Sequence, residues 1–321
     1  MYDFRRIALI GLIAAYGAAV AVPALSQNYP TKHVRIITGN PGTMLDIVAR
    51  RLGQRLGEIW SQPVVVENRG GAGIAPTIAA QSAPDGYSLL LSDRTWLAVA
   101  PSLYRKIAYK PFADFAPITL VASAPQLLVT HPSVPAGNLR DFVSYAKQGP
   151  TDFATGGPGT STHISSEIFR QATGANVVPV NYRGGGAAVM AILGGEVKAG
   201  FSLLPVSLPH VKAGKIKAIA ITSRNRFAGA PEVPTVAESG WAELETSYWI
   251  GLLAPGRTPA ELIGRLNREV TEVLQSAAIR EMLLAQGAEP TPGTPQEFTA
   301  HIKSETAKMK QLIELAGIRA E

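Results

Sequence analysis

Short apolar runs alternate along this chain with longer segments whose apolar residues recur every three or four positions. Residues 34–38 form a mostly apolar run that predicts a buried strand, and residues 45–59 show helical spacing. In the glycine-containing loop between them, Thr43 is the predicted N-cap of the helix and Asp46 its capping partner. The segment therefore predicts a strand, a loop and a helix in that order.

The same order recurs twice farther along the chain. The second copy has a strand at 152–154, glycines at 156–159 and a helix from 162 to 172, with Thr160 or Ser161 as its N-cap. The third copy has a strand at 177–180, a loop at 182–186 and a helix at 187–193. Further strands are predicted at 64–67, 87–92, 199–203 and 216–222. Strands that alternate with helices predict an α/β fold with parallel sheets.

The C-terminal region is predicted to be helical. Thr258 and Thr294 each precede a proline and lie three residues before a glutamate, which is the pattern of a capped helix start. Gly317 is the predicted left-handed end of the last helix. The apolar positions of that helix that we expect to face the core are Phe298, Ile302, Met309, Leu312 and Ile313.

The N-terminus has the three parts of a signal peptide. Arg5 and Arg6 precede an uncharged run at 7–22, and Ala24 and Ser26 bracket Leu25 as a signal peptidase requires. We expect cleavage after Ser26, so that residues 1–26 are removed and the mature protein is periplasmic. The alternative is an uncleaved anchor, but the run is shorter than the roughly 20 residues that span a bilayer. N-terminal sequencing of the exported protein should begin at Gln27.

Removal of 26 residues from 321 leaves 295, a length that favours two domains. The absence of cysteine excludes disulfides and thiolate chemistry. The net charge is +6, but the basic residues are scattered among acidic ones and form no basic run. Nucleic-acid binding is therefore not predicted. No cofactor is predicted, and the five histidines lack metal-ligand spacing, so no metal site is predicted either.

The glycine-rich loops are the candidate functional feature. Backbone N–H groups at a helix N-terminus attract anions, and glycine lets a ligand approach them closely. Three such loops facing one cleft could hold a carboxylate with neutral donors, whereas glycines in a single loop most often make only a turn. The candidate ligand-binding residues are Asn40, Gly42, Thr43, Asp46, Asp93, Thr95, Gly157, Gly159, Thr160, Ser161, His163, Arg183, Gly184 and Ser202.

Several of these candidates also have a purely structural interpretation. Asp46 stabilises a helix start as a cap, and Arg183 could point to solvent instead of clamping a carboxylate. The His163 ring could donate to a ligand or bond a neighbouring carbonyl. The sequence contains no nucleophile elbow, phosphate-binding loop or zinc-protease motif.

The mature chain resembles the receptors of tripartite tricarboxylate transporters, also called Bug-type receptors, over essentially its whole length. The segments that carry the resemblance are 30–32, 41–46, 62–69, 83–87, 114–118, 159–163, 208–215, 234–238 and 251–255. The resemblance implies a type II Venus-flytrap fold of the periplasmic-binding-protein kind, with two α/β domains joined by a two-strand hinge. Applied here, it gives domain 1 at 27–124 plus 247–321 and domain 2 at 125–246.

The resemblance also implies that a monomer captures a carboxylate in the cleft and delivers it to integral-membrane transporter subunits. This chain departs from the family pattern at Thr43, Ala100 and Ser202. Since Ser202 stands where the family often has Asp or Asn, an ammonium would lack a counter-charge, and a dicarboxylate or aromatic acid is favoured over an amino acid. Two other functions stay open: a periplasmic α/β hydrolase using Ser161 and His163, and a sensor module for a membrane kinase.

Overall fold

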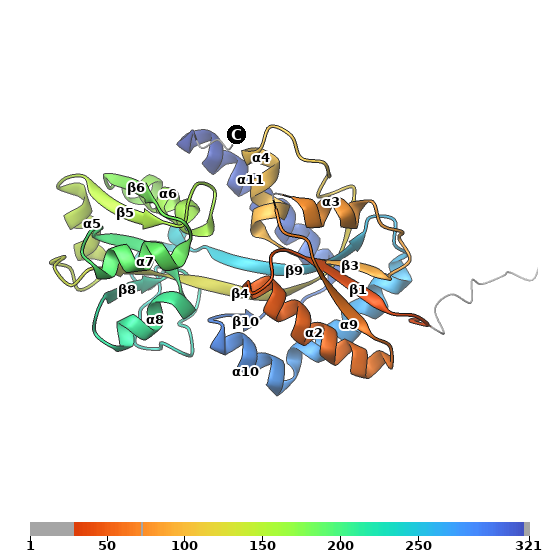
Figure 1. Ribbon diagram of the computed structural model, residues 1–321. Coiled ribbons are helices and arrows are strands. Elements are labelled where there is room, and N and C mark those ends of the chain that lie inside the picture. The colour runs from red at the N-terminus through yellow and green to blue at the C-terminus, as the bar shows by residue number, and fades with distance from the viewer. Residues whose placement is uncertain (1–28, 72, 318–321) are drawn as a thin grey trace, which may run out of the picture.

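Two lobes of strands and helices lie side by side and are bridged by the long strands β4 and β9 (Figure 1). The computed structural model describes residues 29–71 and 73–317, so the predicted signal peptide lies outside the described residues. In this part of the chain, each helix is either too short or too polar to cross a bilayer.

The first lobe is built on the parallel strands β2 (Val64–Asn68), β1 (Val34–Thr38) and β3 (Ser88–Asp93), in that spatial order. Strand β9 (Ser247–Pro255) joins this sheet antiparallel to β3. The short strand β10 (Glu289–Pro290) pairs with β4. The helices of this lobe are α2 (Met44–Trp60), α3 (Ile74–Ala80), the π-helical turn η2 (Thr95–Val99), α4 (Ala100–Leu103), α9 (Ala260–Gln275), α10 (Ala277–Ala285) and α11 (Pro295–Ala316).

The second lobe has β5 (Thr151–Thr155) parallel to both β6 (Val177–Asn181) and β7 (Ala199–Leu203). Strand β8 (Lys217–Ile221) pairs antiparallel with β4. The helical segments of this lobe are α5 (Leu139–Lys147), α6 (Ser161–Thr173), α7 (Gly185–Leu193), α8 (Leu204–Lys212) and the 3₁₀ turn η3 (Ala242–Leu244). All three predicted strand–loop–helix units are present: β1–α2, β5–α6 and β6–α7.

Strand β4 (Phe115–Thr130) belongs to both lobes, because it changes partners along its length. It pairs with β9 from Phe115 to Pro125, and with β7 and β8 from Gln126 to Thr130. This change of partner supports our proposal that the predicted boundary after residue 124 is where the chain first crosses between domains. The sequence analysis missed β4 because Pro117 and Pro125 interrupt it, and proline argues against a central strand.

One large apolar core extends through both lobes, and each lobe has a further apolar cluster of its own. In the second lobe, rings of Phe142, Phe153, Phe169 and Phe201 pack with neighbouring centroids 5.5 to 6.2 Å apart. The predicted core face of α11 is confirmed, since Phe298, Ile302, Met309, Leu312 and Ile313 are all buried.

The structure confirms the predicted start and end of α11 and corrects the predicted start of α9. The Thr294 capping box is confirmed, and Gly317 ends α11 in the left-handed region with φ of 65°. The prediction that Thr258 caps the next helix is wrong, because Pro259 occupies the N-cap position of α9. The buried Thr258 hydroxyl instead donates to the Pro255 carbonyl at 2.7 Å, which closes the turn between β9 and α9.

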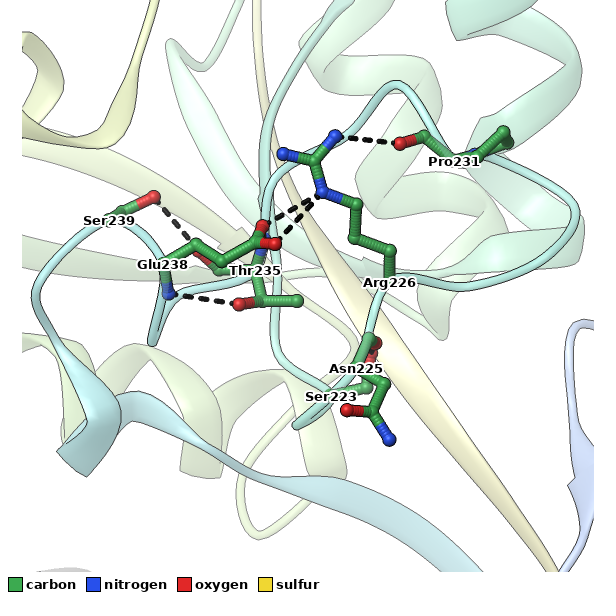
Figure 2. A network of polar contacts seen from close by, with 7 residues as sticks. All are labelled: Ser223, Asn225, Arg226, Pro231, Thr235, Glu238 and Ser239. Carbon is green, nitrogen blue, oxygen red and sulfur yellow. Dashed lines mark hydrogen bonds and ion pairs between the residues drawn. The ribbon is translucent and has the colours of Figure 1, made fainter.

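The loop from β8 toward η3 is held by its own polar network, which Figure 2 shows. Arg226 Nε donates to both oxygens of Glu238, at 3.1 and 2.9 Å, and its Nη1 reaches the Pro231 carbonyl. Glu238 also accepts from the N–H of Thr235 and donates its own N–H to the Thr235 hydroxyl. These contacts tie together both ends of the loop, which then leads into β9 and back to the first lobe.

Candidate functional site

The loops before α2 and α6 share one backbone plan, although they lie in different lobes. Each has the sequence Pro-Gly-Thr directly before the helix, and Thr43 and Thr160 are the N-caps. Gly42 and Gly159 have φ of 75° and 73°, a left-handed conformation that glycine adopts without strain. Each lobe therefore has one of two similar helix starts.

The capping threonines also make equivalent hydrogen bonds. The Thr43 hydroxyl donates to the Asn40 carbonyl at 2.8 Å, and the Thr160 hydroxyl donates to the Gly157 carbonyl at 2.7 Å. Each threonine oxygen in turn accepts from an N–H three residues on, at 3.5 and 3.4 Å. Both hydroxyls are thus engaged within their loops, which fixes how each helix N-terminus is presented.

A side chain one turn into each helix holds the glycine in place. The Gly42 N–H donates to Asp46 Oδ2 at 2.9 Å, and the Gly159 N–H donates to His163 Nδ1 at 3.0 Å. Two amides that we expected to face a ligand are therefore engaged inside their loops in this structure. Asp46 and His163 are buried beneath the loops and support them.

The protonation states of these two side chains follow from their surroundings. Burial acts to raise the pKa of Asp46, but hydrogen bonds from Gly42, Arg50 and Asn68 outweigh it and lower the pKa below the ordinary value. Burial lowers the pKa of His163, against the opposing effect of Glu167. A neutral ring with an accepting Nδ1 carries its proton on Nε2.

The next two N–H groups of each helix are the ones left for a ligand. Among the described residues, the N–H groups of Met44 and Leu45 in α2, and of Ser161 and Thr162 in α6, have no hydrogen-bond partner. Met44 and Ser161 both line one cavity. The unpaired N–H groups of these two lining residues, one at each helix N-terminus, favour an anion in this cavity although no cationic side chain lines it.

The cavity lies between the lobes and has a volume of about 410 Å³, within the usual range for small-molecule sites. The first lobe contributes residues of α2, η2 and α4, the second contributes the loop before α6, and no lining residue carries a charge. The lining residues are Thr43, Met44, Thr95, Leu103, Tyr104, Pro158, Gly159, Thr160, Ser161, Leu203 and Tyr248. The predicted site residues that the structure brings together here are Thr43, Thr95, Gly159, Thr160 and Ser161.

Other predicted site residues lie away from the cavity wall. Arg183 and Gly184 are exposed, in a loop that packs behind the second helix start, where a Cβ on Gly156 would be 3.3 Å from the Gly185 nitrogen. Ser202 is buried, and its hydroxyl donates to the Leu203 carbonyl at 3.2 Å. Asn40 and Gly157 contribute to their loops through the carbonyl groups that accept from the capping threonines.

Asp93 lies beneath the cavity and does not line it. Its Oδ2 accepts from the Tyr248 hydroxyl at 2.8 Å, and its Oδ1 accepts from the Trp96 N–H at 3.3 Å. Burial raises the pKa of Asp93, and hydrogen bonds from Tyr248, Trp96 and Thr95 act against that rise. Asp93 is thus positioned to orient one wall residue, Tyr248.

Sequence reasoning missed several wall residues. Leu103 and Tyr104 end a short helix that the analysis did not predict, and Tyr104 stacks on Trp96 with ring centroids 6.0 Å apart. Tyr248 lies at the start of β9 and meets Asp93 from 155 positions away in the chain. No spacing rule links such positions, so only the fold reveals these contacts.

Comparisons with known proteins agree with this architecture. The family described as "Tripartite tricarboxylate transporter family receptor" matches residues 48–318. Protein BugT of Bordetella pertussis is 37% identical over 321 residues, and the match covers 98% of each chain. A solved structure described as a periplasmic transporter is 34% identical, with a TM-score of 0.76, and covers 91% of this chain and 99% of its own.

A solved protein of R. palustris with adipate is 32% identical to this chain, with a TM-score of 0.77. The match covers 91% of this chain and 99% of that one. These likenesses confirm the predicted α/β fold of the periplasmic-binding-protein kind.

Proposed function

Since this chain belongs to the tripartite tricarboxylate transporter receptor family, we propose that it captures a small organic carboxylate between its lobes and delivers it to membrane subunits of that transporter type. The family consists of periplasmic solute-binding receptors, so this chain is a receptor and not an enzyme. The hydrolase alternative is therefore wrong. Consistent with this, His163 Nδ1 is occupied by the Gly159 N–H and is not a base for Ser161.

One observation carries the proposal: two matching helix N-termini from different lobes meet at one uncharged cavity. The unpaired N–H groups of Met44 and Ser161 are positioned to donate to the same anion, directly or through water. A carboxylate that directs one oxygen to each lobe would accept hydrogen bonds from both helix N-termini. Its binding would therefore favour closure of the two lobes. Binding and closure are then coupled, because neither lobe alone provides the complete set of donors.

The walls of the cavity favour a ligand with an apolar body. Met44, Leu103, Tyr104 and Leu203 surround the space beside the two helix starts. We propose a dicarboxylate or an aromatic acid, since a relative of this chain was solved with adipate. An amino acid is disfavoured because no residue that lines the cavity carries a carboxylate for an ammonium group.

We also propose how the protein is exported and which kind of membrane partner it has. We propose that residues 1–26 are removed as a signal peptide and that the mature protein acts as a monomer in the periplasm. A sensor that presents its closed form to a membrane kinase would use the same cavity. Genes for transporter membrane subunits next to this gene would support transport, and a neighbouring kinase gene would support sensing.

A thermal-shift panel of dicarboxylates, tricarboxylates, aromatic acids and amino acids tests the function, because a ligand that binds only the folded state raises apparent stability. We expect a carboxylate to raise the melting temperature, and isothermal titration to show that Arg183→Ala keeps the affinity. Arg183 is exposed and away from the cavity, so abolished binding in this variant would contradict recognition by helix N-termini.

A further inference from the structure

One hydroxyl of the cavity wall is tied to a buried carboxylate. Tyr248 lines the cavity, and its hydroxyl donates to Asp93 behind it at 2.8 Å. The Asp93 side chain is 7% exposed, and its two oxygens accept from Tyr248 and from the Trp96 N–H. It therefore belongs to the scaffold of the wall, outside the reach of solvent.

The direction of these hydrogen bonds determines what the wall offers. The Tyr248 hydroxyl directs its proton toward Asp93 Oδ2. A hydroxyl whose proton is committed keeps only lone pairs for other partners. This wall therefore presents hydrogen-bond acceptors to the cavity, whereas the two helix N-termini present donors.

A buried cation lies close to Asp93. Arg94 is 1% exposed, donates to the Thr246 hydroxyl at 2.7 Å and interacts electrostatically with Asp93 and with Glu305. Asp93 is therefore held behind the wall by Tyr248, the Trp96 N–H and this cation.

We propose that the ligand presents a hydrogen-bond donor, such as a hydroxyl group, to Tyr248, while its carboxylate lies at the helix N-termini. This inference rests on the proposed function and makes the ligand class narrower. Among aromatic acids and dicarboxylates, those that carry such a donor are favoured. A plain dicarboxylate has to direct its second carboxylate elsewhere in the cavity.

Isothermal titration of two matched series tests the proposal. The first series is succinate, malate and aspartate, and the second is benzoate, para-hydroxybenzoate and para-aminomethylbenzoate. Within each series the members differ by a hydrogen, a hydroxyl or an ammonium-bearing group. In a series that binds, we expect a donor-bearing member to bind up to about tenfold tighter than its unsubstituted parent, the effect of one well-formed hydrogen bond. The hydroxyl and ammonium members identify which donor is used.

Tyr248→Phe is the critical variant, because it removes the acceptor and keeps the ring. We expect the preference for the donor-bearing member over its parent acid to fall to about twofold. The matched control is Tyr29→Phe, which removes a buried hydroxyl that donates to the Gly86 carbonyl far from the cavity. The control should keep the preference, and circular dichroism of both variants checks their folding.

The possible outcomes separate the two proposals. Tighter binding of the unsubstituted parents, or an equal loss for parent and substituted acid in Tyr248→Phe, would overturn the donor proposal and leave carboxylate capture standing. Should Tyr248→Phe fail to fold, the two ligand series on the wild type still decide, because tighter binding of the unsubstituted parents contradicts the donor proposal. If no carboxylate binds at all, the proposed function fails, and the donor proposal fails with it.

Discussion

Asp46 shows how one carboxylate organises a helix start from below. It accepts from the Gly42 N–H, from Asn68 and from Arg50, each at 2.9 Å. These bonds lower the pKa of Asp46 in the folded protein despite burial. The Asp46 carboxylate therefore links the first-lobe loop to α2 and to the end of β2.

A pH-dependent stability follows from this lowered pKa. A folded-state pKa below the unfolded value contributes stability that is present above about pH 4 and lost as pH falls through the folded pKa. We expect Asp46→Asn to lower the free energy of unfolding at neutral pH by about 1 to 2 kcal/mol, the usual cost of losing such a cap. Urea unfolding from pH 7 to pH 3 should show a smaller loss of stability for the variant than for the wild type.

Asp141→Asn is the matched control for this experiment. Asp141 is an exposed acid in the first turn of α5. Its replacement should leave the shape of the acid-range curve close to that of the wild type. A wild-type stability that does not fall below pH 4 would contradict the role assigned to Asp46.

At the level of single residues, the contacts of the site between sequence neighbours could be predicted from the sequence. Thr43 and Thr160 were predictable as caps, because an N-cap acts on residues two or three positions away. Tyr248 was not predictable, since it meets Asp93 only after β9 has paired with β3. The acceptor wall is therefore a product of the fold, whereas the donor loops are already visible in the sequence.

Among the elements, α11 begins with a capping box that can be tested directly. The Thr294 hydroxyl accepts from the Glu297 N–H at 3.1 Å, and Glu297 Oε2 accepts from the Thr294 N–H at 2.7 Å. We expect Thr294→Ala to lower the free energy of unfolding by about 1 kcal/mol. Chemical denaturation measures the change, and a retained stability would mean that packing alone fixes this helix start.

Thr294→Ser is the control, because serine keeps the capping oxygen and should stay close to the wild type. A loss as large as that of the alanine variant would point to the threonine methyl group instead of the cap.

Element prediction succeeded where signals are local and failed where they conflict. The units β1–α2, β5–α6 and β6–α7 were predicted, because each combines a strand, glycines and a capped or periodic helix. Strand β4 was missed, since its two prolines are typical of a break in a strand. Those prolines are tolerated because β4 changes partners directly after Pro125 and its register with β9 shifts after Pro117.

For the whole molecule, the contact between the lobes makes closure testable. A Cβ built on Gly159 would be 2.5 Å from Leu103 Cδ2 across the cavity, whereas a Cβ on Gly42 meets nothing within 4 Å. Since both glycines have positive φ, an alanine at either costs about 1 to 2 kcal/mol of backbone strain. We expect Gly159→Ala to weaken ligand binding roughly tenfold more than Gly42→Ala, because only Gly159→Ala obstructs closure.

Isothermal titration with the tightest acid of the panel measures this difference, and small-angle scattering measures ligand-induced compaction. Leu103→Ala in the Gly159→Ala background should restore part of the affinity by relieving the contact. Equal losses in the two glycine variants would show that strain alone matters and that Leu103 does not limit closure.

The two matching loops have an evolutionary consequence. The N–H groups that hold the carboxylate belong to the main chain, so substitutions of side chains that do not support the two loops leave these donors in place. Such side chains in the cavity wall include Leu203 and Tyr248. A duplicated gene could therefore acquire a new acid as its cargo through a few substitutions while it retained carboxylate binding throughout.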